Sequence, residues 1–134
     1  MIIDRFNEFS DAQAVTASAA STNVVDLKAA GNIEGKPYYL IIKTNASATA
    51  SGDATVTFAL QTDSDEAFGS AVTLWSSAAV GKATLVAGYQ VIRLALNGLA
   101  LNKYLRVYYT VATGPLTAGK FDAFLTADGD TNEF

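Results

Sequence analysis

The segment Gly114–Lys120 has the glycine and lysine spacing of a nucleotide-binding P-loop. Gly114 is followed by four residues and then by Gly119 and Lys120, and in a P-loop such a turn holds phosphates through its backbone amides. The motif continues with Ser or Thr as a magnesium ligand, whereas this chain continues with Phe121. The stretch FDAFLTA alternates with a period of two, so it predicts a strand where a P-loop needs a helix. We therefore interpret Gly114–Lys120 as the loop of a β-hairpin that binds no nucleotide.

Acidic side chains gather in two further places that could bind a cation. Asp63, Asp65 and Glu66 lie within four residues of one another, but the residues after them lack the glycine and the final glutamate of an EF-hand loop. The tail DGDTNEF, residues 128–134, resembles the opening of such a loop and is too short to complete it. We expect no metal and no cofactor, although oxygen ligands from a distant loop would restore calcium binding at Asp63. Asp63 with Asp122 would be a glycosidase-like carboxylate pair, but no motif supports it, and we expect no enzymatic activity.

Four large apolar residues are candidate interface anchors: Phe6, Phe9, Trp75 and Phe134. Phe6 and Phe9 stand in a segment of otherwise polar or small residues, and such anchors usually fill a pocket of a partner. In VTLWSS, Trp75 shares a strand face with Thr73 and Ser77 rather than with the apolar residues. Phe134 is a terminal aromatic residue that a partner would cover. The tyrosines and Trp75 could instead line a sugar-binding face, or belong to the core with their hydroxyls in water.

The composition excludes several classes of chemistry. The 134 residues contain no cysteine and no histidine, which rules out thiolate or imidazole zinc sites, cysteine nucleophiles and a Ser-His-Asp triad. Nine basic residues against 13 acidic ones give a formal net charge of −4, without a basic stripe, so we expect no binding of nucleic acid. No apolar run is long enough for a signal peptide or a membrane span, so we expect no membrane partner and synthesis in a cytoplasm.

Strands, rather than helices, are predicted to position these residues. Period-two alternation marks ATVTFALQT, YLRVYYTV and KFDAFLTAD, the pattern of strands with one buried face. Further strands are predicted at Tyr38–Thr44, Val72–Ser77 and Tyr89–Leu96, with less regular ones at Ala14–Ser18 and Val24–Leu27. About eight short strands separated by Gly and Asn turns predict an all-β fold, an antiparallel β-sandwich of jelly-roll type.

The chain is expected to form a single domain, residues 1–134, whose two ends differ from the rest. Residues 1–21 are rich in small side chains and are predicted to form an extended N-terminal arm that binds a partner. Residues 128–134 are predicted to form an acidic tail. One helical turn is expected around Ser64–Phe68, in a polar connection between strands.

Three segments resemble the capsid cement proteins of tailed bacteriophages, which are also called stabilisation or decoration proteins. These segments are FSDAQAVTASAASTNVVDL, ATLVAGYQVIRLAL and YLRVYYTVATGPLTAGKFDAFL. The similarity extends from about Phe9 to about Ala127, and its most specific parts are Ser10–Thr16 and Tyr108–Lys120. The apparent P-loop thus falls inside a segment that resembles a recurring hairpin of a structural protein.

The resemblance implies a jelly-roll fold, no catalysis, and binding to the outer surface of a shell built from the major capsid protein. The protein would then be located on the virion, and its copies would associate, as a homodimer in preference to a trimer. A carbohydrate-binding module of similar fold on a virion is the alternative, and an enzyme with a carboxylate pair is a third. Glycan retention on a planar aromatic platform would distinguish the module from a protein with affinity for assembled shells.

Overall fold

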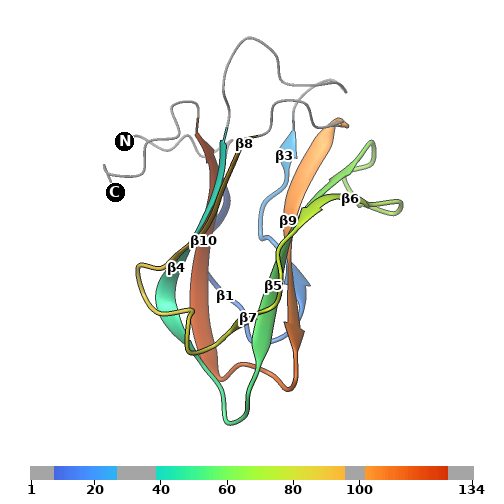
Figure 1. The fold of residues 1–134 in the computed structure, drawn as a ribbon. Coiled ribbons are helices and arrows are strands. Elements are labelled where there is room, and N and C mark those ends of the chain that lie inside the picture. Colours follow the sequence, from blue (N-terminus) through green and yellow to red (C-terminus); the bar gives the residue numbers. More distant parts are fainter. Residues whose placement is uncertain (1–7, 27–38, 96–101, 127–134) are drawn as a thin grey trace.

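Segments with alternating apolar residues form strands, which pack as two sheets face to face (Figure 1). The computed structural model describes residues 8–26, 39–95 and 102–126. Its strands are β1 (Glu8–Ala14), β2 (Ala19–Ala20), β3 (Val25–Asp26), β4 (Tyr39–Thr49), β5 (Thr55–Asp63), β6 (Val72–Ser76), β7 (Val80–Gly81), β8 (Gln90–Ala95), β9 (Tyr104–Ala112) and β10 (Ala118–Thr126). Within these ranges no helix is long and apolar enough to cross a membrane.

The strands form two antiparallel sheets with the order of a jelly roll. Sheet A has the order β1-β10-β4-β8, and sheet B has the order β2-β9-β5-β6, with β3 beside β9 and β7 beside β5. The chain changes sheet between β1 and β2, β3 and β4, β4 and β5, β7 and β8, β8 and β9, and β9 and β10. A double sheet connected in this way is a jelly roll. The predicted all-β sandwich is therefore confirmed.

The core lies between the sheets and consists mainly of alternate residues of the long strands, together with residues of the connections such as Val15, Leu85 and Leu116. In β5, Val56, Phe58 and Leu60 are fully buried, while the residues between them are half-buried. The ring of Phe58 meets the rings of Tyr109 at 5.7 Å and of Phe121 at 5.3 Å between centroids, both edge to face. Such aromatic pairs stabilise the fold beyond the area that they bury. The period-two runs were thus assigned correctly to strands, although in β10 Phe124, which was placed on the opposite face, is buried as well.

The predicted N-terminal arm is wrong for the part that the structure describes. That part forms β1, which pairs with β10, and β2, which pairs with β9. Phe9 is fully buried in the core. Two register shifts interrupt β1, and Ala12 has a φ of +49°. These irregularities break the period-two alternation, which is why the sequence does not show this strand, and most of Ala14–Ser18 links β1 to β2 instead.

Two connections also differ from prediction. The β5–β6 connection is a turn without a helix, closed by a hydrogen bond of 2.9 Å from the amide of Phe68 to the carbonyl of Asp65. Gly114–Lys120 is not part of a hairpin, because it leads from β9 in sheet B to β10 in sheet A. Hairpins are the usual link between successive strands, but a jelly roll alternates between sheets. Since a strand begins at Ala118, this loop has no helix N-terminus to bind a phosphate.

Candidate interaction surfaces

The four predicted interface residues are not equivalent in the structure. Phe9 lies in the core, which removes it from the candidate anchors. Trp75 on β6 is half-buried, stands opposite Leu60 of β5 and packs against the core. Directly opposite residues of an antiparallel pair share a face, so the Trp75 ring covers the margin of the core rather than an outer face. Phe6 and Phe134 lie outside the described residues.

Asp63, from the first acidic cluster, holds the β5–β6 connection in place. Its carboxylate accepts hydrogen bonds from the amides of Ser70 at 2.8 Å and of Asp65 at 3.1 Å. The bond from Ser70, more than any other interaction, holds the pKa of Asp63 below its ordinary value, because it favours the charged form. No group of three metal-ligating side chains occurs in residues 8–26, 39–95 and 102–126. The hydrogen bonds of Asp63 therefore hold this connection in place.

Asp122, the suggested partner of Asp63 in a carboxylate pair, lies in the other sheet. It stands on β10 between two core residues and so points to the outer face of sheet A. Its carboxylate accepts the amide of Ala12 at 2.6 Å and the Nδ2 group of Asn45 at 3.2 Å. The structure does not bring the two carboxylates together as an acid and a base, since each belongs to a different sheet and binds neighbouring amides.

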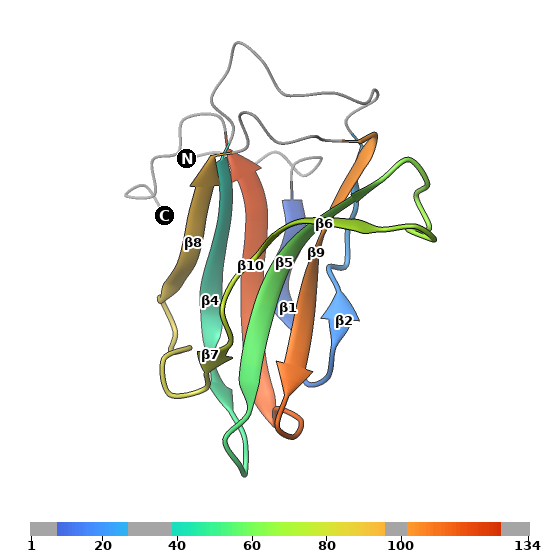
Figure 2. The ribbon, with the colours of Figure 1, turned by 45° about the vertical axis from the view of Figure 1, so that its right-hand side comes forward.

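One edge of the sandwich is sealed by residues 8–26, and we call it the closed edge. β1 extends sheet A beside β10, while β2 and β3 extend sheet B beside β9. The same segment therefore crosses from one sheet to the other, at the side where β1 and β2 lie in Figure 2. Its apolar side chains Phe9, Val15 and Val25 expose 2% of their surface or less. The core is fully covered on this side.

Polar side chains inside the closed edge tie the two sheets together. The hydroxyl oxygens of Ser10 on β1 and Tyr109 on β9 lie 2.7 Å apart, and Ser10 Oγ donates to Gln13 Oε1 at 2.6 Å. Gln13 Oε1 also accepts the amide of Thr22 at 2.8 Å, and Gln13 Nε2 donates to the carbonyl of Ala20 at 3.0 Å. Burial raises the pKa of Tyr109, because the ionised phenolate would lack water. This network fixes the N-terminal segment across both sheets.

The opposite edge consists of β6, β8 and the connecting residues 77–89, and we call it the open edge. Among the described strands, β8 pairs only with β4, and β6 pairs only with β5. Figure 2 shows β8 at the margin of its sheet, with no strand beyond it. Leu85 of the connecting residues is fully buried in the core, whereas six other apolar side chains here pack against the core but are only half-buried: Leu74, Trp75, Val80, Val91, Ile92 and Leu94. The core is incompletely covered on this side.

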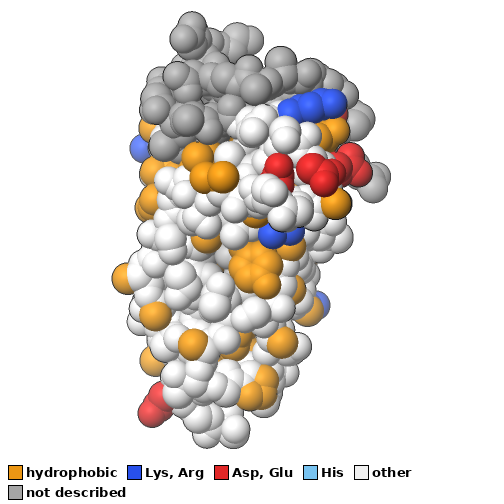
Figure 3. Space-filling model, turned by 90° about the vertical axis from the view of Figure 1, so that its right-hand side faces the viewer, with side chains coloured by type: hydrophobic (Ala, Val, Ile, Leu, Met, Phe, Trp, Pro, Cys, Tyr) orange, Lys and Arg blue, Asp and Glu red, His pale blue; other side chains and the backbone are white. Residues whose placement is uncertain are grey.

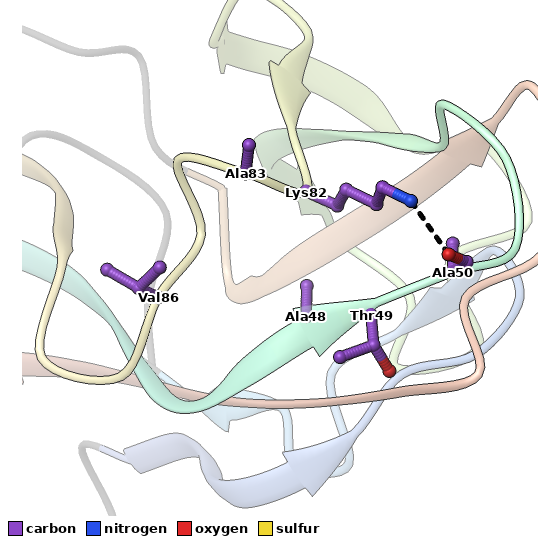
Figure 4. A pocket seen from close by; sticks show the side chains of 6 residues that line it. All are labelled: Ala48, Thr49, Ala50, Lys82, Ala83 and Val86. Atoms are coloured by element: carbon purple, nitrogen blue, oxygen red, sulfur yellow. Dashed lines mark hydrogen bonds between the residues drawn. The ribbon is translucent and has the colours of Figure 1, made fainter.

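A shallow hollow of about 320 Å³ lies beside the open edge, between the end of β4 and the loop before β8 (Figure 4). Its lining is Ala48, Thr49, Ala50, Lys82, Ala83 and Val86. The Lys82 ammonium group donates to the carbonyl of Ala50 at 2.7 Å and bridges one end of the hollow. Val86, which is 50% exposed, and Tyr89, which is 37% exposed, are large apolar residues of the same loop. The loop before β8 therefore presents exposed apolar side chains.

The outer face of sheet B carries a short row of aromatic and cationic side chains on β9. The Arg106 guanidinium lies 4.4 Å from the ring centroid of Phe68 and 5.3 Å from that of Tyr108, and its Nε donates to Gln61 Oε1 at 2.7 Å. Figure 3 shows this side of the molecule, where most of the surface is uncharged and most of the charged side chains lie toward one end. Because Arg106 stacks on Tyr108, this row is not a bare planar platform of the kind that stacks on sugars.

The residues that characterise the open edge were not predicted from the sequence. Arg93 is the one charged residue of β8 and is exposed, with its guanidinium 4.6 Å from the ring centroid of Tyr39. The predicted strand Tyr89–Leu96 corresponds to β8, Gln90–Ala95, with Leu96 outside the described residues, but alternation within a strand does not reveal whether the strand lies at an edge. Edge strands often carry a charge, but this signal does not identify β8, because the central strands β4 and β9 also carry one charged residue each, Lys43 and Arg106.

A comparison with known families gives a match across the whole sandwich. The family model described as Bbp16 matches residues 9–125. The match begins within β1 and ends within β10, so it includes both the closed and the open edge. It fits a phage-related protein. No curated protein matches the chain.

Proposed function

The chain belongs to the Bbp16 family, and from this premise we propose that it is a cement, or decoration, protein of a phage head. It binds the outer surface of the assembled shell, clamps neighbouring subunits of the major capsid protein, and adds no catalysis. The observation that carries the proposal is the family match over residues 9–125. This range contains the three segments that resemble the cement proteins of tailed phages.

A clamp needs a rigid body more than it needs one strong contact. A standard interface buries only about 800 Å² on each partner, and the free energy of one such contact can be modest. When one molecule contacts two subunits, the second contact becomes intramolecular, and avidity can exceed the affinity of a single contact by about 10²–10⁴. The packed sandwich, with its aromatic core and cross-sheet hydrogen bonds, supplies the rigidity.

The position of the acidic residues supports a role without catalysis. Asp63 and Asp122 bind backbone amides in different sheets, so the carboxylate pair that would serve a glycosidase is not formed. On the shell, copies associate with one another, as a dimer in preference to a trimer. Sedimentation of the purified protein over a range of concentrations measures this association.

The proposal is tested by co-sedimentation of the purified protein with heads assembled without it, in parallel with pull-down by unassembled capsid subunits. We expect binding to the heads, little binding to free subunits, and a higher temperature of genome release from the decorated heads, because only the lattice presents neighbouring subunits together. Retention on a glycan array without affinity for heads would contradict the proposal and favour the carbohydrate-binding module. Tyr104 and Tyr108 would then be the first residues to replace.

A further inference from the structure

We propose that the open edge is a docking site for an extended segment of the shell subunit, which adds to sheet A as a new strand beside β8. This inference rests on the proposed function, since it states which part of the partner the clamp binds and where. It assigns the closed edge to stability and the open edge to binding.

The backbone of β8 provides the first argument. On one side, Ile92 to Ala95 pairs regularly with β4, and a register shift follows toward Gln90. On its other side, β8 has no neighbouring strand among the described residues. The N–H and C=O groups along such a side are a template for an additional strand, and strand addition to a sheet edge is a recurrent way of binding extended segments.

The half-buried apolar side chains provide the second argument. Ile92 and Leu94 of β8, together with Leu74 and Trp75 of β6, pack against the core without being covered. At the closed edge, β1 is the strand that covers the corresponding margin, and its Phe9 is fully buried. A strand beside β8 would cover the open margin in the same way, provided that its inward-facing residues are apolar. Each Å² of apolar surface removed from water favours binding.

Charge specifies the segment further. Arg93 lies on the outer face of sheet A, because it pairs with Ile41, which alternates with the core residues of β4. An acidic residue on the added strand, directly opposite Arg93, would form a favourable cross-strand pair. The segment is therefore extended, apolar at alternate positions, and acidic at one position between them.

A second copy of the chain fits this edge less well. In a continuous sheet about a two-fold axis, β8 would pair antiparallel with the β8 of the other copy, and residues of the same face would lie opposite one another. With the two strands fully overlapped, the two Arg93 side chains are then directly opposite or diagonal neighbours. Like charges in these positions are destabilising. The charge thus favours a different, acidic partner over self-pairing.

The test uses the intact protein and heads assembled without it. Amide hydrogen exchange is measured for the free protein and for the protein bound to heads, and shell affinity is compared for Arg93→Glu and Lys120→Glu. Lys120 is an exposed lysine on β10, so its variant has the same change of charge at a distance from β8. We expect exchange at residues 90–95 to slow by tenfold or more on the heads, roughly tenfold weaker binding of Arg93→Glu, and a change below about threefold for Lys120→Glu.

The outcomes separate this inference from the proposed function. If the wild-type protein binds heads but residues 90–95 exchange as in the free protein, or if both variants bind equally, the docking site is wrong and the cement function stands. If the wild-type protein does not bind heads, both fail. Slower exchange at residues 90–95 that appears with rising protein concentration, without heads, would mean that a second copy occupies the edge and would overturn the inference.

Cross-linking identifies the occupant directly. The chain has no cysteine, so Ala95→Cys, at an exposed position of β8, introduces a unique thiol for a photoactivatable cross-linker. We expect the linked peptide to come from the major capsid protein and to alternate apolar residues around an acidic one. A peptide from another copy of this chain, or a capsid peptide without this pattern, would contradict the proposal.

Discussion

The closed and open edges cover the same core to very different extents. At the closed edge, one segment pairs with β9 and β10, and Phe9, Val15 and Val25 are almost completely buried. At the open edge, β6 and β8 have no further strand in the described part of the chain, and their apolar side chains remain half-buried. The difference indicates that one edge stabilises the fold while the other retains apolar surface that a partner can bury. Replacements at the two edges should therefore separate stability from binding.

The largest difference is expected between Phe9→Ala and Trp75→Ala. Phe9→Ala removes a fully buried ring and should lower the free energy of unfolding by about 3–5 kcal/mol, because it leaves a cavity. Trp75 is only half-buried, so Trp75→Ala should cost less, about 1–2 kcal/mol, and should weaken binding to heads. Urea denaturation measures both values. Equal losses of stability would mean that the two edges are equivalent.

The next effect concerns Gly119, whose carbonyl accepts the amide of Val15 at the closed edge. Gly119 has a φ of +151°, and a Cβ atom there would lie 3.3 Å from the Cα of Ala48. Gly119→Ala should therefore destabilise the fold by about 1–3 kcal/mol, through backbone strain and overpacking. Gly88→Ala, at a positive φ without neighbours near a new Cβ, is the control for strain alone. A Gly119→Ala variant with wild-type stability would show that β10 at Gly119 and β4 at Ala48 lie farther apart than the structure indicates.

Tyr109→Phe tests the hydrogen bond that crosses the closed edge. Loss of the bond to Ser10 should cost about 1 kcal/mol at neutral pH. Because the pKa of Tyr109 is raised in the folded state, its contribution is complete below the unfolded tyrosine pKa of about 10 and is lost as the pH rises above it. Thermal unfolding at increasing pH should thus show a smaller alkaline loss of stability in the variant. An identical alkaline loss would mean that Tyr109 does not titrate in this way.

The smallest effect is expected for Asp63→Asn, at the connection that leads to β6. The amide oxygen of the variant can replace only part of the bonding to Ser70 and Asp65. Since the pKa of Asp63 is lowered in the folded state, its contribution is present above the unfolded carboxyl pKa of about 3.9 and is lost as the pH falls through the folded value. Stability measured between neutral and acidic pH should converge for the two proteins at low pH. A difference in stability between the two proteins that stays the same at every pH would contradict the role given to the ionised carboxylate of Asp63.

Local alternation allowed much of the fold to be predicted, whereas the two edges could not be. β5, β9 and β10 were recognised because one face of each is apolar over many residues, and their pairing into a jelly roll is consistent with their number and spacing. β1 was taken for an arm because its register shifts and the positive φ of Ala12 interrupt the alternation. The edge position of β8 follows from pairings between segments far apart in the sequence, so Arg93 was overlooked and Phe9 was assigned to an interface.

The central claim is that the protein binds the shell through its open edge and is stabilised by its closed edge. The most direct test is an electron cryo-microscopy map of heads decorated with this protein, at a resolution that resolves neighbouring strands. The account predicts density for an extended segment of the capsid subunit beside β8, covering Ile92 and Leu94, with residues 8–26 away from the shell. A map in which β8 faces solvent while the closed edge contacts the shell would contradict it.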